Sequence, residues 1–276
     1  MELSTLSRWG LSKLPVEICL GGRKMRAVQV VMDRLTRESP LLDSFSTPYG
    51  NFQIDPRHPP QRVLAYCFYN ILNHYKRSPL GQRILSKDWD GKTFVDVGAN
   101  LGMYSLIARS AGADSYAFEP EPAHAEFLRR NRELLGNIFP IALSDSVGEL
   151  PLFYSPGNSG ATSLVSSPGY VESTETIEIS TFSLQDLGDK DRIELVKIDV
   201  EGNELLTIRG MRDFLDQGHR PEIWCEVRGG MASRSRNSAV DVIEAVKPYG
   251  YRYCATDGTS LTFDRKSVFD LLFLPR

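Results

Sequence analysis

The stretch Thr93-Phe-Val-Asp-Val-Gly-Ala-Asn-Leu-Gly102 decides the fold of this 276-residue chain. It begins with an apolar run of strand length that ends at Gly98, and Gly102 opens a helical pattern that extends to Ala111. A strand, a glycine turn and a helix in this order are typical of the first unit of an open α/β sheet. In such sheets ligands of nucleoside type bind at the carboxyl end of the strand, beside the glycine turn.

Apolar runs and helical patterns continue to alternate after this stretch. The alternation predicts a parallel sheet covered by helices on both faces. Only residues 256–266 separate the last two strands, too few for a parallel crossover, so we expect an antiparallel hairpin there. The predicted fold class is α/β, with a Rossmann-like, seven-stranded mixed sheet that has one antiparallel edge strand. The predicted strands are 93–97, 115–118, 137–143, 193–198, 222–227, 251–255 and 268–274, and the helices are 102–111, 122–135, 204–215 and 238–249.

Two regions break this alternation. Residues 1–90 predict a helical N-terminal extension with a small hairpin at 47–55 and a surface helix at 62–85, ahead of a second domain at 91–276. Residues 146–181 contain no long helix, and short strands are predicted at 149–154 and 176–180. Between them, 11 of the 19 residues from Ser155 to Ser173 are Gly, Pro or Ser. Because loops of this length in compact domains are often lids, we expect residues 155–173 to cover a substrate, with a plain surface loop as the alternative.

Composition excludes several classes of protein. The 32 basic and 35 acidic residues give a net charge of −3, which disfavours a dedicated nucleic-acid binder. No apolar run is long enough for a signal peptide or a membrane span. The four cysteines have no metal or redox spacing, so we expect reduced thiols in a cytoplasmic protein. Residues 1–90 hold 13 basic and 8 acidic residues. We expect them to contact an anionic substrate or to join copies of the chain as a homo-oligomer, with a solvated helical face as the alternative.

The glycine turn has the spacing G-x-x-x-G, and no Lys or Arg lies between Phe94 and Ala108. It therefore lacks the patterns that bind pyrophosphate or triphosphate. Asp96 at its mouth favours a ligand with an ammonium group. Gly98 permits a tight turn, and Gly102 permits close approach to the helix start.

Two acidic positions follow later strands. Glu119 ends the second strand, where a carboxylate accepts hydrogen bonds from a ribose diol, although a helix-start carboxylate is the alternative. Asp145, with Ser144 before it, follows the third strand and is placed to accept a hydrogen bond from an adenine amino group. A turn-starting aspartate explains Asp145 equally well.

The segment Val196-Lys-Ile-Asp-Val-Glu-Gly-Asn-Glu204 brings several carboxylates to the end of the fourth strand. Crowding of Asp199, Glu201 and Glu204 favours a proton acceptor, whereas Mg²⁺ binding and helix capping by Glu204 are alternatives. Glu226 ends the next strand at the same edge. Lys197, in a buried run, is expected to pair with a carboxylate.

Together, Asp96-Val-Gly-Ala-Asn-Leu-Gly102, Phe118-Glu-Pro120, Gly157-Asn-Ser-Gly-Ala-Thr-Ser-Leu164 and Lys197-Ile-Asp-Val-Glu-Gly202 resemble the FkbM family of S-adenosylmethionine-dependent methyltransferases. The resemblance covers about residues 45–275 and leaves residues 1–44 without a counterpart. It implies a class I methyltransferase fold and O-methylation of a hydroxyl of a sugar, a polyketide or another natural product.

The resemblance also implies roles for single residues. Asp96, Gly98 and Asn100 would line the methionine end of the cofactor, Glu119 would hold the ribose, and Ser144 and Asp145 would hold the adenine. Asp199 and Glu201 would face the methyl acceptor.

Methyl transfer to an alcohol needs alignment and a base, for which we favour Asp199 and then Glu201. We expect His124 to be a surface histidine. Glu226, Tyr170 and Trp224, with Tyr154, are candidates for binding the acceptor, and burial in the core is the alternative for these aromatic residues.

Three alternatives stay open at this point. An NAD-dependent oxidoreductase is disfavoured by the glycine spacing, and an RNA methyltransferase would need a basic, aromatic groove. A degenerate methyltransferase fold that acts as an assembly partner would need a damaged glycine turn, and here the turn is intact. No metal site is predicted; a divalent ion is an open question. The expected partner is a small-molecule acceptor, and no nucleic acid is expected.

Overall fold

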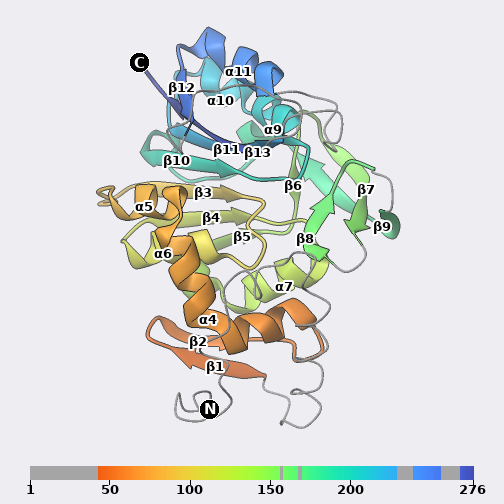
Figure 1. The fold of residues 1–276 in the computed structure, drawn as a ribbon. Coiled ribbons are helices and arrows are strands. Elements are labelled where there is room, and N and C mark those ends of the chain that lie inside the picture. The colour runs from red at the N-terminus through yellow and green to blue at the C-terminus, as the bar shows by residue number, and fades with distance from the viewer. Residues whose placement is uncertain (1–42, 156–157, 167–169, 229–238, 256–267) are drawn as a thin grey trace.

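The computed structural model describes residues 43–155, 158–166, 170–228, 239–255 and 268–276. Its centre is a seven-stranded sheet with the order β12-β13-β11-β10-β3-β4-β5 (Figure 1). The strands are β3 (Thr93–Val97), β4 (Asp114–Phe118), β5 (Asn137–Phe139), β10 (Ile193–Ile198), β11 (Glu222–Arg228), β12 (Arg252–Ala255) and β13 (Val268–Leu274).

The directions of the strands confirm the predicted α/β fold class. β5, β4, β3, β10 and β11 run parallel, and β13 runs antiparallel to both β11 and β12. The reversed strand β13 lies one place in from the edge strand β12. Because parallel strands share a direction, the carboxyl ends of β3, β4, β10 and β11 all meet at one edge of the sheet.

Helices cover both faces of this sheet, which is why all five residues of β3 are buried. Phe94 and Leu195 point into one core with α4 (Pro59–Arg77), α5 (Pro79–Leu85) and α6 (Met103–Ser110). Val95 and Val196 point into a second core with α9 (Glu204–Gly210), α10 (Arg212–Asp216) and α11 (Ala239–Val246). The alternation of side chains along each strand thus builds two cores.

The described part of the N-terminal region packs onto the first of these cores. The expected hairpin consists of β1 (Ser44–Thr47) and β2 (Gly50–Gln53), and it lies below α4 in Figure 1. The surface helix predicted at 62–85 is wrong in two respects. It is broken into α4 and α5 at Ser78, whose hydroxyl caps α5 by accepting the Gly81 N–H at 3.0 Å, and Leu64, Phe68 and other apolar side chains of α4 are buried.

Two predicted helices are each divided. The helix expected at 122–135 consists of α7 (Pro122–Arg130) and α8 (Arg132–Leu135). It breaks at Asn131, whose amide side chain accepts the Gln53 N–H and donates to the Gln53 carbonyl, so β2 is held against the break. The helix expected at 204–215 is likewise divided into α9 and α10. Single-turn helices η2 (Phe182–Leu184), η3 (Lys190–Arg192) and η4 (Lys247–Tyr249) complete the helical elements described.

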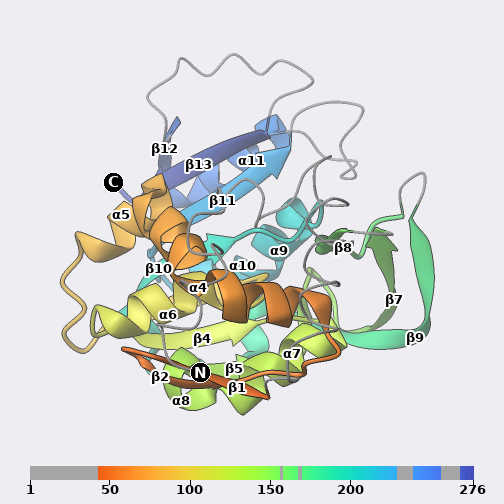
Figure 2. The same ribbon diagram turned by 60° about the horizontal axis from the view of Figure 1, so that its bottom comes forward.

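A second, four-stranded sheet lies beside the central one. The short strands predicted at 149–154 and 176–180 are present in it, but their pairing into a separate sheet was not predicted. Its order is β6-β9-β7-β8, with β6 (Ala142–Leu143), β7 (Gly148–Ser155), β8 (Asn158–Ser163) and β9 (Val171–Ser180). Figure 2 shows β7 and β9 projecting from one side of the molecule. The strand expected at 137–143 is divided at Pro140 between the two sheets, and part of the loop expected at 155–173 is the strand β8.

Some predictions fall outside the described residues, namely the helical segment before residue 43 and the helix start at Ser238. Among the helices that the structure describes, none combines the length and the apolar character that a bilayer crossing requires.

Candidate active site

The glycine bend after β3 lies at the carboxyl edge of the sheet and is tied to both neighbouring strands. The Gly98 and Ala99 N–H groups donate to the Phe118 carbonyl at 2.9 and 3.0 Å. Gly98 has φ +78°, and a Cβ atom there would lie 1.9 Å from the Asp199 carbonyl oxygen. The tight turn predicted at Gly98 is therefore present, and close approach by the end of β10 is the reason for the glycine.

A glycine is needed at position 102 for a different reason. It caps α6 with φ +73°, and a Cβ atom there would lie 2.8 Å from Leu128 Cδ2 and 3.1 Å from Leu135 Cδ1. The close approach expected at this helix start is thus made by side chains of α7 and α8. A direct contact of Gly102 with a cofactor remains a prediction.

Glu119 is fixed by backbone groups on either side of it. Its Oε2 accepts the Asn100 N–H at 2.7 Å, and its Oε1 accepts the Glu121 N–H at 2.9 Å. Asn100 itself has the left-handed φ of +53°. Burial raises the pKa of Glu119 to about 7, although these two hydrogen bonds act in the opposite direction. Each oxygen keeps a second lone pair, so the carboxylate retains the capacity to accept hydrogen bonds from a diol.

A buried ion pair lies directly below the bend. Lys197 Nζ is 3.0 Å from Asp96 Oδ1, donates to the Gly98 carbonyl at 2.7 Å and lies 3.6 Å from Asp199 Oδ2. Asp96 Oδ2 accepts the Ser105 hydroxyl at 2.8 Å. Burial by itself lowers the pKa of Lys197, but the charges of Asp96 and Asp199 outweigh it and raise the pKa, so the ammonium is retained.

This arrangement corrects one expectation and confirms another. Asp96 does not stand at the mouth of the bend, because its side chain is 0% exposed and faces Lys197. Its charge is compensated within the protein rather than offered to an ammonium ligand. The expected pairing of Lys197 with a carboxylate is confirmed. Lys197 thereby connects the glycine bend to the end of β10, a positioning role that the sequence analysis did not identify.

Three carboxylates converge beside the bend. One oxygen from each of Asp199, Glu201 and Glu226 lies within 4.8 Å of the other two. All three side chains are partly exposed. Glu204, which the sequence places in the same cluster, points away: it is buried, and its Oε1 accepts the Gly202 N–H at 2.7 Å. The third member of the group is therefore Glu226, because β11 lies next to β10.

The loop after β10 is held from the second sheet. Glu201 has φ +54°, a conformation that costs a non-glycine residue about 1–2 kcal/mol. Its carbonyl accepts the hydroxyl of the buried Ser163, at the end of β8, at 2.7 Å. The segment expected to form a lid thus contacts the backbone of a candidate catalytic residue. Strained non-glycine residues of this kind concentrate at functional sites.

Ser144 and Asp145, the two residues expected to bind adenine, differ in burial. Ser144 is buried, and its N–H donates to the Ser180 carbonyl at 2.8 Å. Asp145 is exposed and lines a cavity of about 590 Å³ with Leu205, Arg209 and other residues of α9, α10, α11 and η4. Their contact with an adenine remains a prediction.

Of the aromatic residues considered for the acceptor, Trp224 is 4% exposed and packs with Leu195 and Leu272 in the first core. Its burial favours the alternative named for these aromatic residues, a place in the core, and an acceptor contact of Trp224 stays an untested prediction. Tyr170 is partly buried ahead of β9, and its role stays a prediction.

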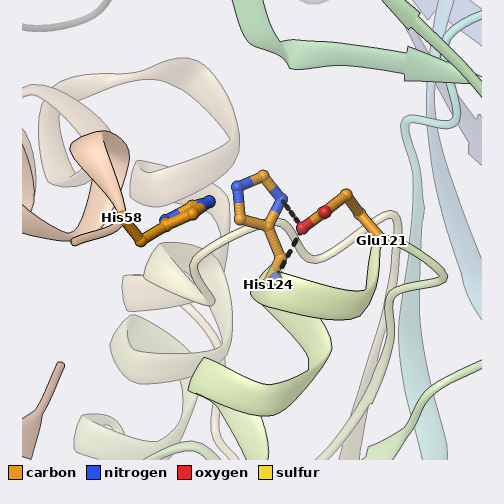
Figure 3. A group of neighbouring side chains, drawn as sticks. All are labelled: His58, Glu121 and His124. Carbon is orange, nitrogen blue, oxygen red and sulfur yellow. Dashed lines mark hydrogen bonds and ion pairs between the residues drawn. The ribbon is translucent and has the colours of Figure 1, made fainter. Parts of the chain in front are cut away.

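His124 is a further correction. We expected a surface histidine, but its side chain is 2% exposed and lies between His58 and Glu121 (Figure 3). Neither His58 nor Glu121 was singled out from the sequence. Their grouping depends on the packing of α4 against the start of α7, which no local pattern encodes.

The chain is similar to known methyltransferases. Residues 96–253 match the model of the methyltransferase FkbM domain. Hexuronic acid methyltransferase AglP of Haloferax volcanii is 36% identical over 124 residues, which cover 44% of this chain and 50% of that protein. Methyltransferase sdnD of Sordaria araneosa is 32% identical, with 42% of this chain and 59% of that protein covered. The chain thus spans only about half to three fifths of the length of these curated relatives.

Among solved structures, a TehB-like SAM-dependent methyltransferase from Corynebacterium glutamicum has a TM-score of 0.44 and 10% identity. The match covers 76% of this chain and 95% of that structure. A likeness at this level carries no information about activity.

Proposed function

Since the chain belongs to the methyltransferase FkbM family, we propose that it transfers a methyl group from S-adenosylmethionine to a hydroxyl of a sugar, a sugar acid or another natural product. The observation that carries this proposal is the joint anchoring of two features by Lys197. The same ammonium group holds the Gly98 carbonyl at 2.7 Å and lies 3.6 Å from the Asp199 carboxylate. A cofactor beside the bend and an acceptor beside Asp199 would therefore be aligned by one buried cation.

The groups at the bend fit a nucleoside that carries no phosphate. Glu119 offers a preorganised carboxylate, which suits the two hydroxyls of a ribose. The bend from Phe94 to Ala108 has no basic side chain to receive a phosphate. Gly98 and Asn100 would hold the methionine end, and Ser144 and Asp145 would hold the adenine. When bound, S-adenosylmethionine supplies an electrophilic methyl group.

The carboxylate group formed by Asp199, Glu201 and Glu226 would serve the acceptor. A carboxylate within hydrogen-bond reach of the acceptor hydroxyl orients it and takes its proton as the new oxygen–carbon bond forms. Asp199 is our first candidate for this base, because its side chain is 35% exposed and is fixed on one side by Lys197. Glu201 is the second candidate, and Glu226 would bind the acceptor.

The choice of acceptor follows from charge and from the relatives. The name of the relative hexuronic acid methyltransferase suggests a sugar acid, whereas the relatives from Sordaria araneosa and Beauveria bassiana are named only as methyltransferases. Three clustered carboxylates repel an anion, so a carboxylate of the acceptor would lie away from Asp199 while a hydroxyl approaches it. For the same reason a phosphate-rich RNA acceptor is not favoured.

The experiment that tests this proposal measures binding and turnover separately. Calorimetry with S-adenosylhomocysteine measures cofactor binding. Turnover is measured as the formation of S-adenosylhomocysteine from S-adenosylmethionine in the presence of a panel of glycosides and uronic acids. We expect Asp199→Asn to lower kcat about 10²–10⁴-fold with unchanged cofactor affinity, since a general base contributes a factor of that size.

Asp213→Asn is the matched control, because Asp213 is an exposed aspartate on α10. Failure of the unmodified chain to bind S-adenosylmethionine or S-adenosylhomocysteine would overturn the proposed function. Turnover by Asp199→Asn at the level of Asp213→Asn would overturn only the assignment of the base.

A further inference from the structure

A second group of metal-binding side chains lies where α4 meets α7, outside the carboxylate group of the active site. His58 is the N-cap residue of α4, Glu121 is the N-cap residue of α7, and His124 belongs to the first turn of α7. One nitrogen or oxygen atom from each side chain lies within 4.8 Å of the corresponding atoms of the other two. Figure 3 shows the His124 ring between the other two side chains.

Two nitrogen atoms in this group have no hydrogen-bond partner among the described residues. They are His124 Nε2 and His58 Nδ1, and both atoms are buried. The His124 side chain is 2% exposed, whereas the other edge of its ring lies 3.5 Å from Glu121 Oε2. A buried polar atom without a partner costs about 1–3 kcal/mol, so each of these two nitrogens needs a partner that the described residues do not supply.

The atoms of this group suit one class of ligand. A neutral imidazole ring has one nitrogen that carries no proton, and the lone pair of that nitrogen can bind a metal ion. Two imidazole nitrogens and one carboxylate oxygen suit zinc and similar ions, whereas Mg²⁺ and Ca²⁺ prefer oxygen ligands alone.

We propose that His58, Glu121 and His124 bind a divalent transition-metal ion of the zinc class. Three protein ligands leave one position of a tetrahedral ion for water or an exogenous group.

The position of the group predicts what the ion does. It would join the N-terminus of α4 to the N-terminus of α7, two positions 63 residues apart in the sequence, and so hold the hairpin and α4 against the sheet. Its effect would also reach the loop at Glu119, because the Glu121 N–H donates to Glu119 Oε1 at 2.9 Å. This makes the ion a structural crosslink beside the active site rather than a participant in the reaction.

The test uses the full chain without a histidine tag. Bound metal is first removed with a chelator, and the chain is then titrated with Zn²⁺ in competition with a chromophoric chelator that reports the Zn²⁺ not bound by the protein. We expect one Zn²⁺ per chain in this group and a higher Tm on binding. His58→Ala and Glu121→Gln should each weaken this binding by about 10-fold or more. His74→Ala is the matched control, because His74 is an exposed histidine on the same helix. Co²⁺ in place of Zn²⁺ should give the absorption of a tetrahedral site.

Each outcome decides the proposal. Loss of one Zn²⁺ equivalent in His58→Ala and Glu121→Gln, with retention in His74→Ala, supports it. No uptake by the unmodified chain, or equal uptake by all four proteins, overturns it. Since His124 is buried and His124→Ala risks unfolding, the test depends on the half-buried His58 and on Glu121. All these measurements are independent of methyl transfer, so the proposed function and the metal site fail or succeed separately.

Discussion

Lys197→Met removes the cation that joins the glycine bend to the carboxylate group, and its cost follows from the geometry. The side chains of Lys197 and Asp96 are 5% and 0% exposed, so the carboxylate left behind cannot recover hydration. Removing one partner of a buried ion pair typically costs about 3–5 kcal/mol. The Gly98 carbonyl also loses its 2.7 Å hydrogen bond. We therefore expect the free energy of unfolding to fall by about 3–5 kcal/mol.

Urea denaturation at neutral pH measures this loss, and two further variants interpret it. The double variant Asp96→Asn/Lys197→Met removes both charges of this pair, so we expect about 1–3 kcal/mol of the loss to be recovered. Lys247→Met is the matched control: its ion pair with Glu244 is exposed on both sides, and such pairs contribute less than about 1 kcal/mol.

The same variant tests the positioning role. Because Lys197 also fixes the bend, Lys197→Met should weaken S-adenosylhomocysteine binding as well as turnover, whereas Asp199→Asn should affect turnover alone. A stability loss no larger than that of Lys247→Met, or a double variant that loses as much stability as Lys197→Met or more, would refute this account of the buried pair.

Three further predictions concern the bend and its neighbours. Burial raises the pKa of Glu119 to about 7, so cofactor affinity, measured by calorimetry, should fall as the pH drops below about 7 and the carboxylate gains a proton. This fall should be absent in Glu119→Gln. The stability of the chain relative to that of Glu119→Gln, measured by urea titration, should fall as the pH rises from 4.5 to about 7, because the unfolded carboxyl loses its proton more readily than the buried one. Glu201→Gly should be about 1 kcal/mol more stable than Glu201→Gln in urea, because glycine accepts φ +54°, while both lose turnover; equal stabilities would exclude backbone strain at this position. Gly98→Ala should cost about 2–5 kcal/mol and weaken cofactor binding, because the new Cβ meets the Asp199 carbonyl at 1.9 Å; the control Gly250→Ala has the similar φ of +80° and nothing within 4 Å, so equal losses by thermal melting would contradict the close-approach argument.

Local patterns account for much of the fold that was predicted. The run from Thr93 to Gly102 encodes a strand, a turn and a helix start, because apolar spacing and glycine conformation act within a few residues. The central sheet follows from the same kind of signal. In the second sheet, β7 and β9 were predicted in part. The strand β8 was missed because it lies in a Gly- and Ser-rich segment, and β6 was not separated from the strand before it because it has only two residues; strand pairing decides these elements where local preference does not.

In the candidate site, too, some residues could be predicted from the sequence and others depend on packing. The sequence brings Asp199 and Glu201 together because they follow one strand, and it places Glu119 at the end of another. It does not reveal that Glu204 turns inward while Glu226 completes the carboxylate group, because this depends on the neighbouring strand β11.

Sequence alone determined the class of the sheet, the glycine bend and the family resemblance, since these arise from short-range spacing and order. The pairing of Asp96 with Lys197 inside the protein and the place of Trp224 in the core came from three-dimensional packing. The tertiary structure alone brought His58 to His124. Burial and charge compensation depend on what packs against a side chain, and the packing partners here come from distant parts of the chain.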